Sequence, residues 1–272
     1  MGLGKSAAVV IGSFPLGESD RVVTFYARDF GKIRGVAKAS RRIRSRFAGA
    51  LELFTLGELI FFDTGRSELV RIDHFDILHP FDRVRGDLER LGQAAWIVEC
   101  VARLTAEHDR HVALYALLVR SLRALEGPVP PARVAVCFGV RALETLGHRP
   151  RLDACTMCGR AYPFRRPALG PSGVVCEACA REDTGAVPAS PAALGWFERL
   201  RSARWEEALV ARIGGSESEM GALLERIGGS ESEMGALLEN QVSRLIGQPT
   251  RTAKFLREVR RLEPAPGGHP RW

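Results

Sequence analysis

Four cysteines form two Cys-x-x-Cys pairs, Cys155 with Cys158 and Cys176 with Cys179, and this spacing is typical of a structural zinc site. Two residues between thiolates allow a tight turn to aim both sulfurs at one ion, and a second turn completes a tetrahedron. The alternatives are two disulfides or four unrelated buried cysteines. Because four thiolates leave no open coordination position, a catalytic role for this zinc is not expected.

The other residues that could catalyse a reaction do not form a recognisable active site. The chain has no His-x-Glu motif, which a hydrolytic deaminase would need. Its six histidines are scattered, and His108 and His111 lack a partnered carboxylate motif, so we interpret them as surface residues. Gly4-Lys-Ser6 resembles the end of a phosphate-binding P-loop, but a strand-like segment follows where a helix is required. The sequence therefore predicts a protein that is not an enzyme.

Positive charge is the second informative feature of the chain. The net charge is +7 and is carried mainly by arginine, whose guanidinium group pairs well with phosphate. Between Gly31 and Leu51 there is no acidic residue, while basic residues recur at Lys32, Arg34, Lys38, Arg41, Arg42, Arg44 and Arg46. Strand alternation would place the first three on one face, and residues 40–46 would extend that surface as a loop.

We predict that this basic segment binds nucleic acid without sequence preference, because a positive groove on a small barrel suits a phosphate backbone. The alternative is a solvated arginine-rich face. Phe47 is expected to anchor the loop or the core rather than to stack on a base.

Apolar periodicity predicts a barrel followed by helices. Segments rich in valine, isoleucine and phenylalanine predict strands over residues 7–14, 21–28, 32–37, 50–53, 56–63 and 68–75. So many strands in so short a segment favour a small closed barrel. The apolar period then becomes helical and predicts helices over residues 81–104, 111–125 and 131–146. Cys100 and Cys137 lie in these helices and are predicted to be core residues.

The C-terminal part contains a duplication. After a linker and a helix predicted over residues 192–200, the same fourteen residues, RIGGSESEMGALLE, occur at 212–225 and 226–239. We interpret the duplication as having no function of its own, and we expect the second copy to begin a structural helix that includes Leu237, Leu238, Val242, Leu245 and Ile246. A last helix over residues 250–262 carries Lys254, Arg257 and Arg261 at helical spacing, as a stripe for DNA or for an acidic partner.

These patterns together predict an α+β multidomain protein. Its parts are a β-barrel over residues 1–79, a helical domain over 80–150, a zinc-binding module over 151–187, C-terminal helices over 188–263 that complete the helical domain, and a disordered tail over 264–272. No segment approaches the length of a membrane span, and we expect a cytoplasmic protein.

Several motifs resemble the RecO family of bacterial recombination mediators. They are Pro15-Leu-Gly-Glu-Ser-Asp20, Asp29-Phe-Gly-Lys-Ile-Arg-Gly-Val-Ala-Lys38, Ser45-Arg-Phe47, Leu51-Glu-Leu-Phe54, Leu143-Glu-Thr-Leu-Gly147 before the first cysteine pair, and Lys254-Phe-Leu256. Their combination in this order, over nearly the whole chain, makes the resemblance specific. The duplicated fourteen residues are a departure from the family pattern.

The resemblance implies an N-terminal OB-fold, a helical domain and a zinc module. It implies a DNA repair and recombination mediator that binds single- and double-stranded DNA, anneals complementary strands and helps RecA to load onto DNA coated by single-stranded DNA-binding protein. The implied partners are RecR and the acidic C-terminal tail of that binding protein, and the implied location is the nucleoid. A zinc-ribbon RNA-binding or ribosome-associated protein is the alternative, since the same barrel and charge would serve it.

Overall fold

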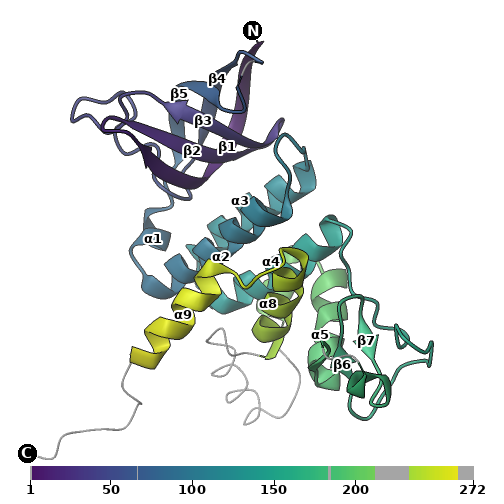
Figure 1. Ribbon diagram of the computed structural model, residues 1–272. Helices are drawn as coiled ribbons and strands as arrows, with labels where there is room; N and C mark the ends of the chain where they lie inside the picture. The colour runs from purple at the N-terminus through teal and green to yellow at the C-terminus, as the bar shows by residue number, and fades with distance from the viewer. Residues whose placement is uncertain (1, 66, 183–184, 212–232, 263–272) are drawn as a thin grey trace, which may run out of the picture.

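The computed structural model describes residues 2–65, 67–182, 185–211 and 233–262. A β-barrel built from the N-terminal residues lies at one end of the molecule (Figure 1). Helices form the middle, and a small module with short strands packs beside them (Figure 1). The predicted α+β multidomain architecture is confirmed.

The barrel consists of five strands in the closed order β1-β2-β3-β5-β4, which is the topology of an OB-fold. All neighbouring strands are antiparallel except β3 and β5. The strands are β1 (Gly2–Leu16), β2 (Asp20–Ala27), β3 (Gly31–Ala37), β4 (Leu56–Asp63) and β5 (Val70–His79). Gly4, Lys5 and Ser6 lie within β1, which confirms that they do not form a P-loop.

The predicted strand over residues 50–53 is wrong, because this segment is a turn in the long loop between β3 and β4. Ala50 and Leu51 are both buried in the barrel core, together with Phe47. The backbone of this segment closes local turns: the N–H of Ala50 donates to the carbonyl of Phe47, and the N–H of Thr55 donates to the carbonyl of Glu52. These apolar side chains instead fix the loop to the barrel, so the prediction that Phe47 anchors the loop is confirmed.

The helical domain is organised around α4 (Pro131–Thr145), which packs against α2, α3, α5, α6 and α8. The predicted helix over residues 81–104 is divided into α1 (Asp82–Arg85) and α2 (Leu88–Leu104). The division occurs because the side chain of Asp87 accepts a hydrogen bond from the Arg90 N–H and caps α2. Helix α3 (Val112–Leu125) follows, and Cys100 and Cys137 are buried as predicted.

The C-terminal helices complete the same core. They are α5 (Pro191–Ser202), α6 (Trp205–Val210), α8 (Glu233–Leu245) and α9 (Arg251–Leu262). Helix α8 begins within the second copy of the duplication, and Leu237, Leu238 and Val242 are buried as expected. Leu245 differs from expectation because it lies at the helix end and is 41% exposed. The first copy of the duplication and the predicted disordered tail lie outside the described residues.

The cysteine pairs lie in a module of three short strands and one helical turn. Strand β6 (Ala168–Leu169) pairs with both β7 (Val174–Val175) and β8 (Val187–Pro188). The helical turn is η1 (Cys179–Arg181). Cys155 and Cys158 are in a separate turn, Cys176 directly follows β7, and Cys179 begins the helical turn. Among the described residues, no helix combines the length and the apolar character that crossing a membrane requires.

The barrel is docked on the helical domain through the outer face of β1 and β2 and through the start of β3. Val9, Ile11 and Tyr26 point away from the barrel core and belong to the apolar core of the helices. The Nζ atom of Lys32 donates hydrogen bonds to the carbonyl oxygens of Ala102 (2.7 Å) and Thr105 (2.5 Å) at the end of α2. At the far end of the outer face, near the β1–β2 turn, Phe14 and Leu16 are exposed, whereas Val22 is buried.

Candidate nucleic-acid interface and metal centre

The predicted basic residues do not all lie on the same free surface. Lys32 and Arg34 both project from the outer face of β3, as the alternation predicts, but the prediction for Lys38 is wrong because β3 ends at Ala37. Lys32, however, is half-buried against α2, and burial of its ammonium group lowers its pKa. The cation therefore stabilises the carbonyl end of α2, where a positive charge is favourable. Arg34 is partly exposed and lies 3.8 Å from a carboxylate oxygen of Glu107.

The remaining basic residues gather in the loop between β3 and β4. Lys38, Arg41, Arg42, Arg44 and Arg46 are all exposed. Among them, only Arg46 has an ion-pair partner within the described residues, at 3.8 Å from Asp73. This surface, which we call the basic loop (residues 38–46), is therefore a concentration of positive charge with little neutralisation by protein carboxylates.

The basic loop is held in place rather than free to move as a flexible tether. Beyond it, Phe47, Ala50 and Leu51 insert into the barrel core. On the other side, the N–H of Arg41 donates to the carbonyl of Ser19, and its guanidinium Nη1 donates to the carbonyl of Gly17. These bonds fix the loop against the β1–β2 turn, so the arginines present a defined surface.

Asp20 supplies a further anchor for the basic loop. Its Oδ1 atom accepts hydrogen bonds from the N–H of Ala39 at 2.8 Å and from the hydroxyl of Ser19 at 2.9 Å. These bonds, with smaller effects from Lys38 and Arg42, hold the pKa of Asp20 below its ordinary value. A single carboxylate thus positions the loop without pairing directly with its arginines.

Sequence reasoning missed the exposed apolar side chains of this surface. Ile43 lies between Arg42 and Arg44 and is 101% exposed. Phe14 and Leu16, at the end of β1, are 46% and 42% exposed. The composition of the basic run indicates only its charge. The apolar side chains of Phe14 and Leu16 join this surface because the loop lies beside the β1–β2 turn.

The second basic stripe is only partly described. Lys254 is exposed on α9, whereas the side chains of Arg257 and Arg261 lie outside the described part of that helix. The start of α9 is anchored by Glu99 of α2, whose carboxylate accepts from the N–H groups of Arg251 (2.7 Å) and Thr252 (2.9 Å). The role of the stripe stays a prediction.

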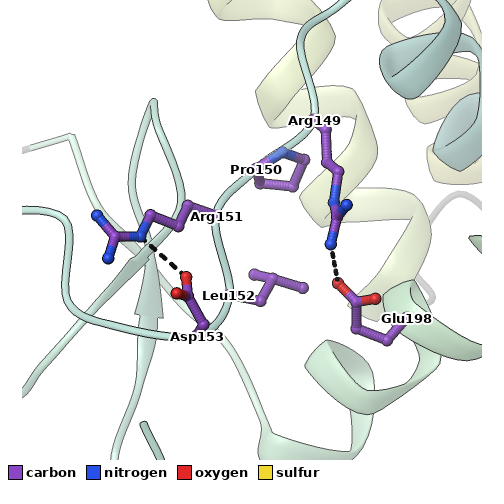
Figure 2. A pocket seen from close by; sticks show the side chains of 6 residues that line it. All are labelled: Arg149, Pro150, Arg151, Leu152, Asp153 and Glu198. Atoms are coloured by element: carbon purple, nitrogen blue, oxygen red, sulfur yellow. Dashed lines mark hydrogen bonds and ion pairs between the residues drawn. The ribbon is translucent and has the colours of Figure 1, made fainter. Parts of the chain in front are cut away.

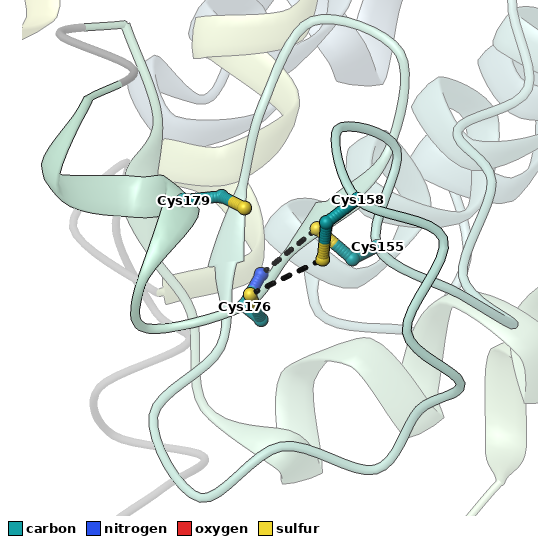
Figure 3. Close-up of side chains that lie close together, drawn as sticks. All are labelled: Cys155, Cys158, Cys176 and Cys179. Atoms are coloured by element: carbon teal, nitrogen blue, oxygen red, sulfur yellow. Dashed lines mark hydrogen bonds between the residues drawn. The ribbon is translucent and has the colours of Figure 1, made fainter.

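The four predicted metal ligands come together at the predicted place. The Sγ atoms of Cys155, Cys158, Cys176 and Cys179 all lie within 4.8 Å of one another (Figure 3). All four are free thiols, which excludes two disulfides in this structure. Cys155 and Cys158 flank one turn and Cys176 and Cys179 the other, so the cluster ties the two arms of the module together.

The surroundings of the cluster favour a thiolate at Cys155, whereas hydrogen bonds with Cys176 and Cys158 raise the pKa of Cys179 to about 12. The N–H of Cys176 donates to the Sγ of Cys155 at 3.4 Å. Burial alone would raise the pKa of the Cys155 thiol, but hydrogen bonds from the backbone N–H groups of Cys158, Cys176 and Met157 outweigh it and lower the pKa to about 6. A thiolate is the form that binds a metal ion, and the four sulfur atoms lie close enough together to share one ion.

A surface pocket beside this module has little free positive charge. It is lined by residues 149–153 and by Glu198 (Figure 2). Its two arginines already have carboxylate partners: Arg149 lies 3.1 Å from Glu198, and Arg151 lies 2.9 Å from Asp153 (Figure 2). The pocket therefore offers a phosphate less unneutralised charge than the basic loop does.

An OB-fold barrel with a basic loop, followed by a helical domain and a cluster of four cysteines that could hold a metal ion, defines a multidomain OB-fold protein. The chain belongs to the recombination protein O family of DNA repair and recombination proteins. The family model described as "Recombination protein O N terminal" matches residues 1–81, and the one described as "Recombination protein O C terminal" matches residues 85–227. The resemblance to RecO is confirmed.

Curated relatives carry the same name. The DNA repair protein RecO of Anaeromyxobacter sp. (strain K) is 37% identical over 201 residues, which cover 72% of this chain and 78% of that protein. The DNA repair protein RecO of Myxococcus xanthus (strain DK1622) is 38% identical over 186 residues, which cover 66% of this chain and 75% of that protein.

Proposed function

We propose that this protein is a non-enzymatic recombination mediator that binds single- and double-stranded DNA, anneals complementary strands and assists RecA loading onto DNA coated by single-stranded DNA-binding protein. The observation that carries the proposal is the basic loop, whose cations are exposed and fixed on an OB-fold barrel. OB-folds bind oligonucleotides on the face of strands 2 and 3 and on the loops that join strands 1 to 2 and 4 to 5, and Arg41 fixes the basic loop against the first of these.

Annealing follows from charge neutralisation. Two complementary strands repel each other through their phosphates, and a protein surface that binds both strands lowers that repulsion. Each phosphate that is neutralised on a single strand releases counterions and contributes about 0.7 to the slope of log affinity against log salt. The number of basic residues engaged can therefore be measured from the salt dependence, and no nucleotide needs to be hydrolysed.

We expect the triple variant Arg41→Ala, Arg42→Ala, Arg44→Ala to bind single-stranded DNA more weakly and to reduce the salt slope by about 2. The matched control also removes three exposed arginines, but takes them from the helical and metal-binding parts: Arg120→Ala, Arg149→Ala, Arg151→Ala. It should keep the wild-type slope. An unchanged slope in the first variant, measured by fluorescence anisotropy, would show that the basic loop is not the DNA site.

Zinc is the ion that we propose for the cysteine cluster. Four thiolates at about 2.3 Å from a central Zn²⁺ would lie about 3.8 Å apart. The Sγ atoms of Cys158 and Cys176 are 3.8 Å apart, which supports this assignment. With all four positions filled by sulfur, the ion would hold Cys155 and Cys176 in place and would supply no reactive water.

We further propose RecR and the acidic tail of single-stranded DNA-binding protein as partners, with Lys254 and the rest of the α9 stripe as one candidate site for the tail. The test is to anneal complementary strands coated with that binding protein, either intact or without its acidic tail. Annealing that depends on the tail supports a mediator. Equal annealing with both forms would indicate a generic basic protein.

A further inference from the structure

The outer face of the barrel near the basic loop combines cations with exposed apolar side chains. Phe14 and Leu16 of β1 are 46% and 42% exposed, and Ile43 in the basic loop is 101% exposed. Isolated exposed apolar residues are common on protein surfaces. These three require a different account because they lie beside a cluster of cations that the protein itself leaves largely unneutralised.

The strand register places the exposed Phe14 on the outer face, beside the buried Val22. Phe14 is the direct partner of Val22 on β2, and Val22 is the direct partner of Val36 on β3. Directly paired residues point to the same side of a sheet, so these three side chains form one cross-strand row. Arg34 precedes Val36 by two positions and shares its side of β3. An aromatic ring therefore stands on the OB-fold face formed by strands β1 to β3, with a cation beside its row.

The hydrogen bonds of the loop bring Ile43 to the same end of the barrel. Arg41 binds the carbonyls of Gly17 and Ser19, which lie in the turn directly after Leu16. Ile43 follows two residues later and is flanked by the exposed Arg42 and Arg44. The two arginines can bind phosphates, and the side chain of Ile43 between them can pack against an apolar surface.

We propose that Phe14 and Ile43 contact the bases of single-stranded DNA, while the neighbouring cations bind its phosphates. A single strand presents both charged phosphates and apolar base faces. Its unpaired bases have free faces that stack on aromatic and apolar side chains. Paired bases in a duplex hide those faces, so this surface distinguishes single strands from duplexes. The inference rests on the proposed DNA binding and specifies which part of the DNA these two residues take.

The test compares Phe14→Ala and Ile43→Ser with wild type on a single-stranded oligonucleotide that contains 2-aminopurine. We expect Phe14→Ala to weaken binding about 5- to 150-fold without changing the salt slope. Both variants should reduce the fluorescence change that reports unstacking of the probe base. Phe14→Trp keeps an aromatic face and should retain wild-type affinity. Leu3→Ser is the matched control, since Leu3 is 66% exposed at the other end of β1.

The outcomes separate this inference from the proposed function. If wild type fails to bind DNA, the proposed function is wrong. If wild type binds with a normal salt slope but Phe14→Ala and Ile43→Ser match it in affinity and in probe fluorescence, only the base contacts are wrong. Loss of binding to anionic phospholipid vesicles, with DNA binding intact, would assign the surface to a membrane. Loss of self-association in sedimentation would assign it to a second copy of the chain.

Discussion

Lys32 provides the sharpest test of how the structure divides the basic residues. We expect Lys32→Met to destabilise the protein and to leave the salt slope of DNA binding unchanged. The methionine would retain most of the apolar stem but would remove the ammonium group that donates to the carbonyls of Ala102 and Thr105. Arg42→Ala should lower the salt slope of DNA binding and leave the stability nearly unchanged, because Arg42 is exposed and forms no ion pair among the described residues.

The expected cost can be worked from these contacts. A hydrogen bond that involves a charged group contributes about 1.5–3 kcal/mol, and a cation at the carbonyl end of a helix contributes about 0.3–1 kcal/mol. Because Lys32 is only half-buried, water can replace part of the lost interaction, and we expect a total cost of about 2 kcal/mol. For a chain of this size, that corresponds to a fall in Tm of about 4–8 °C.

The assay is thermal unfolding by calorimetry, together with anisotropy titrations of single-stranded DNA at several salt concentrations. Lys5→Met is the matched control on the same barrel. Lys5 is 60% exposed and pairs with Glu58 at 2.8 Å on the surface, so its loss should cost less than about 1 kcal/mol. If Lys32→Met kept the Tm of this control and lowered the salt slope as Arg42→Ala does, Lys32 would be a DNA contact and our reasoning would be refuted.

Three further outcomes follow from the geometry. Cys176→Ser should lower the metal content and the Tm together, and loss of DNA binding with both intact would contradict a purely structural role for the cluster. Gly31→Ala should destabilise the protein more than Gly17→Ala does in chemical denaturation: both glycines have positive φ, but a Cβ at Gly31 would lie 2.1 Å from the carbonyl oxygen of Asp109, whereas one at Gly17 would meet open space. If both variants lost the same free energy of unfolding, the close approach of Asp109 to position 31 would be relieved without cost. Because the pKa of Asp20 is lowered in the folded protein, its stabilising effect is present above its ordinary value of 3.8 and is lost as pH falls through the folded value. The amide NMR signal of Ala39 should therefore shift in acid, and a similar shift in Asp20→Asn would exclude this carboxylate as the cause.

Local sequence patterns were sufficient to predict the features that depend on residues close together in the chain. The cysteine cluster follows from the Cys-x-x-Cys spacing, because each turn alone aims two sulfurs in one direction. The strands of the barrel follow from the alternation of apolar residues, and alternation also placed Lys32 and Arg34 correctly on one face of β3.

Contacts between distant parts of the chain could not be read from local patterns. The partners of Lys32 lie 70 and 73 residues away, and no periodicity in the basic run indicates them. The segment at Ala50 and Leu51 has the composition of a strand, but its side chains fill the barrel end as a turn. The exposure of Phe14 and Ile43 likewise depends on which barrel surfaces the helices cover. No pattern of neighbouring residues predicts that coverage.

The two apolar cores differ in when they can form during synthesis of the chain. All members of the barrel core lie between Ala8 and Phe75. The helical core needs contacts such as the bond from Trp96 Nε1 to Glu239 and the bond from the Arg251 N–H to Glu99, which join residues 143 and 152 positions apart. A ribosome that translates from the N-terminus therefore releases a complete barrel well before the helices can close. A chain truncated before α8 should retain the basic loop on a folded barrel while its helices stay incomplete.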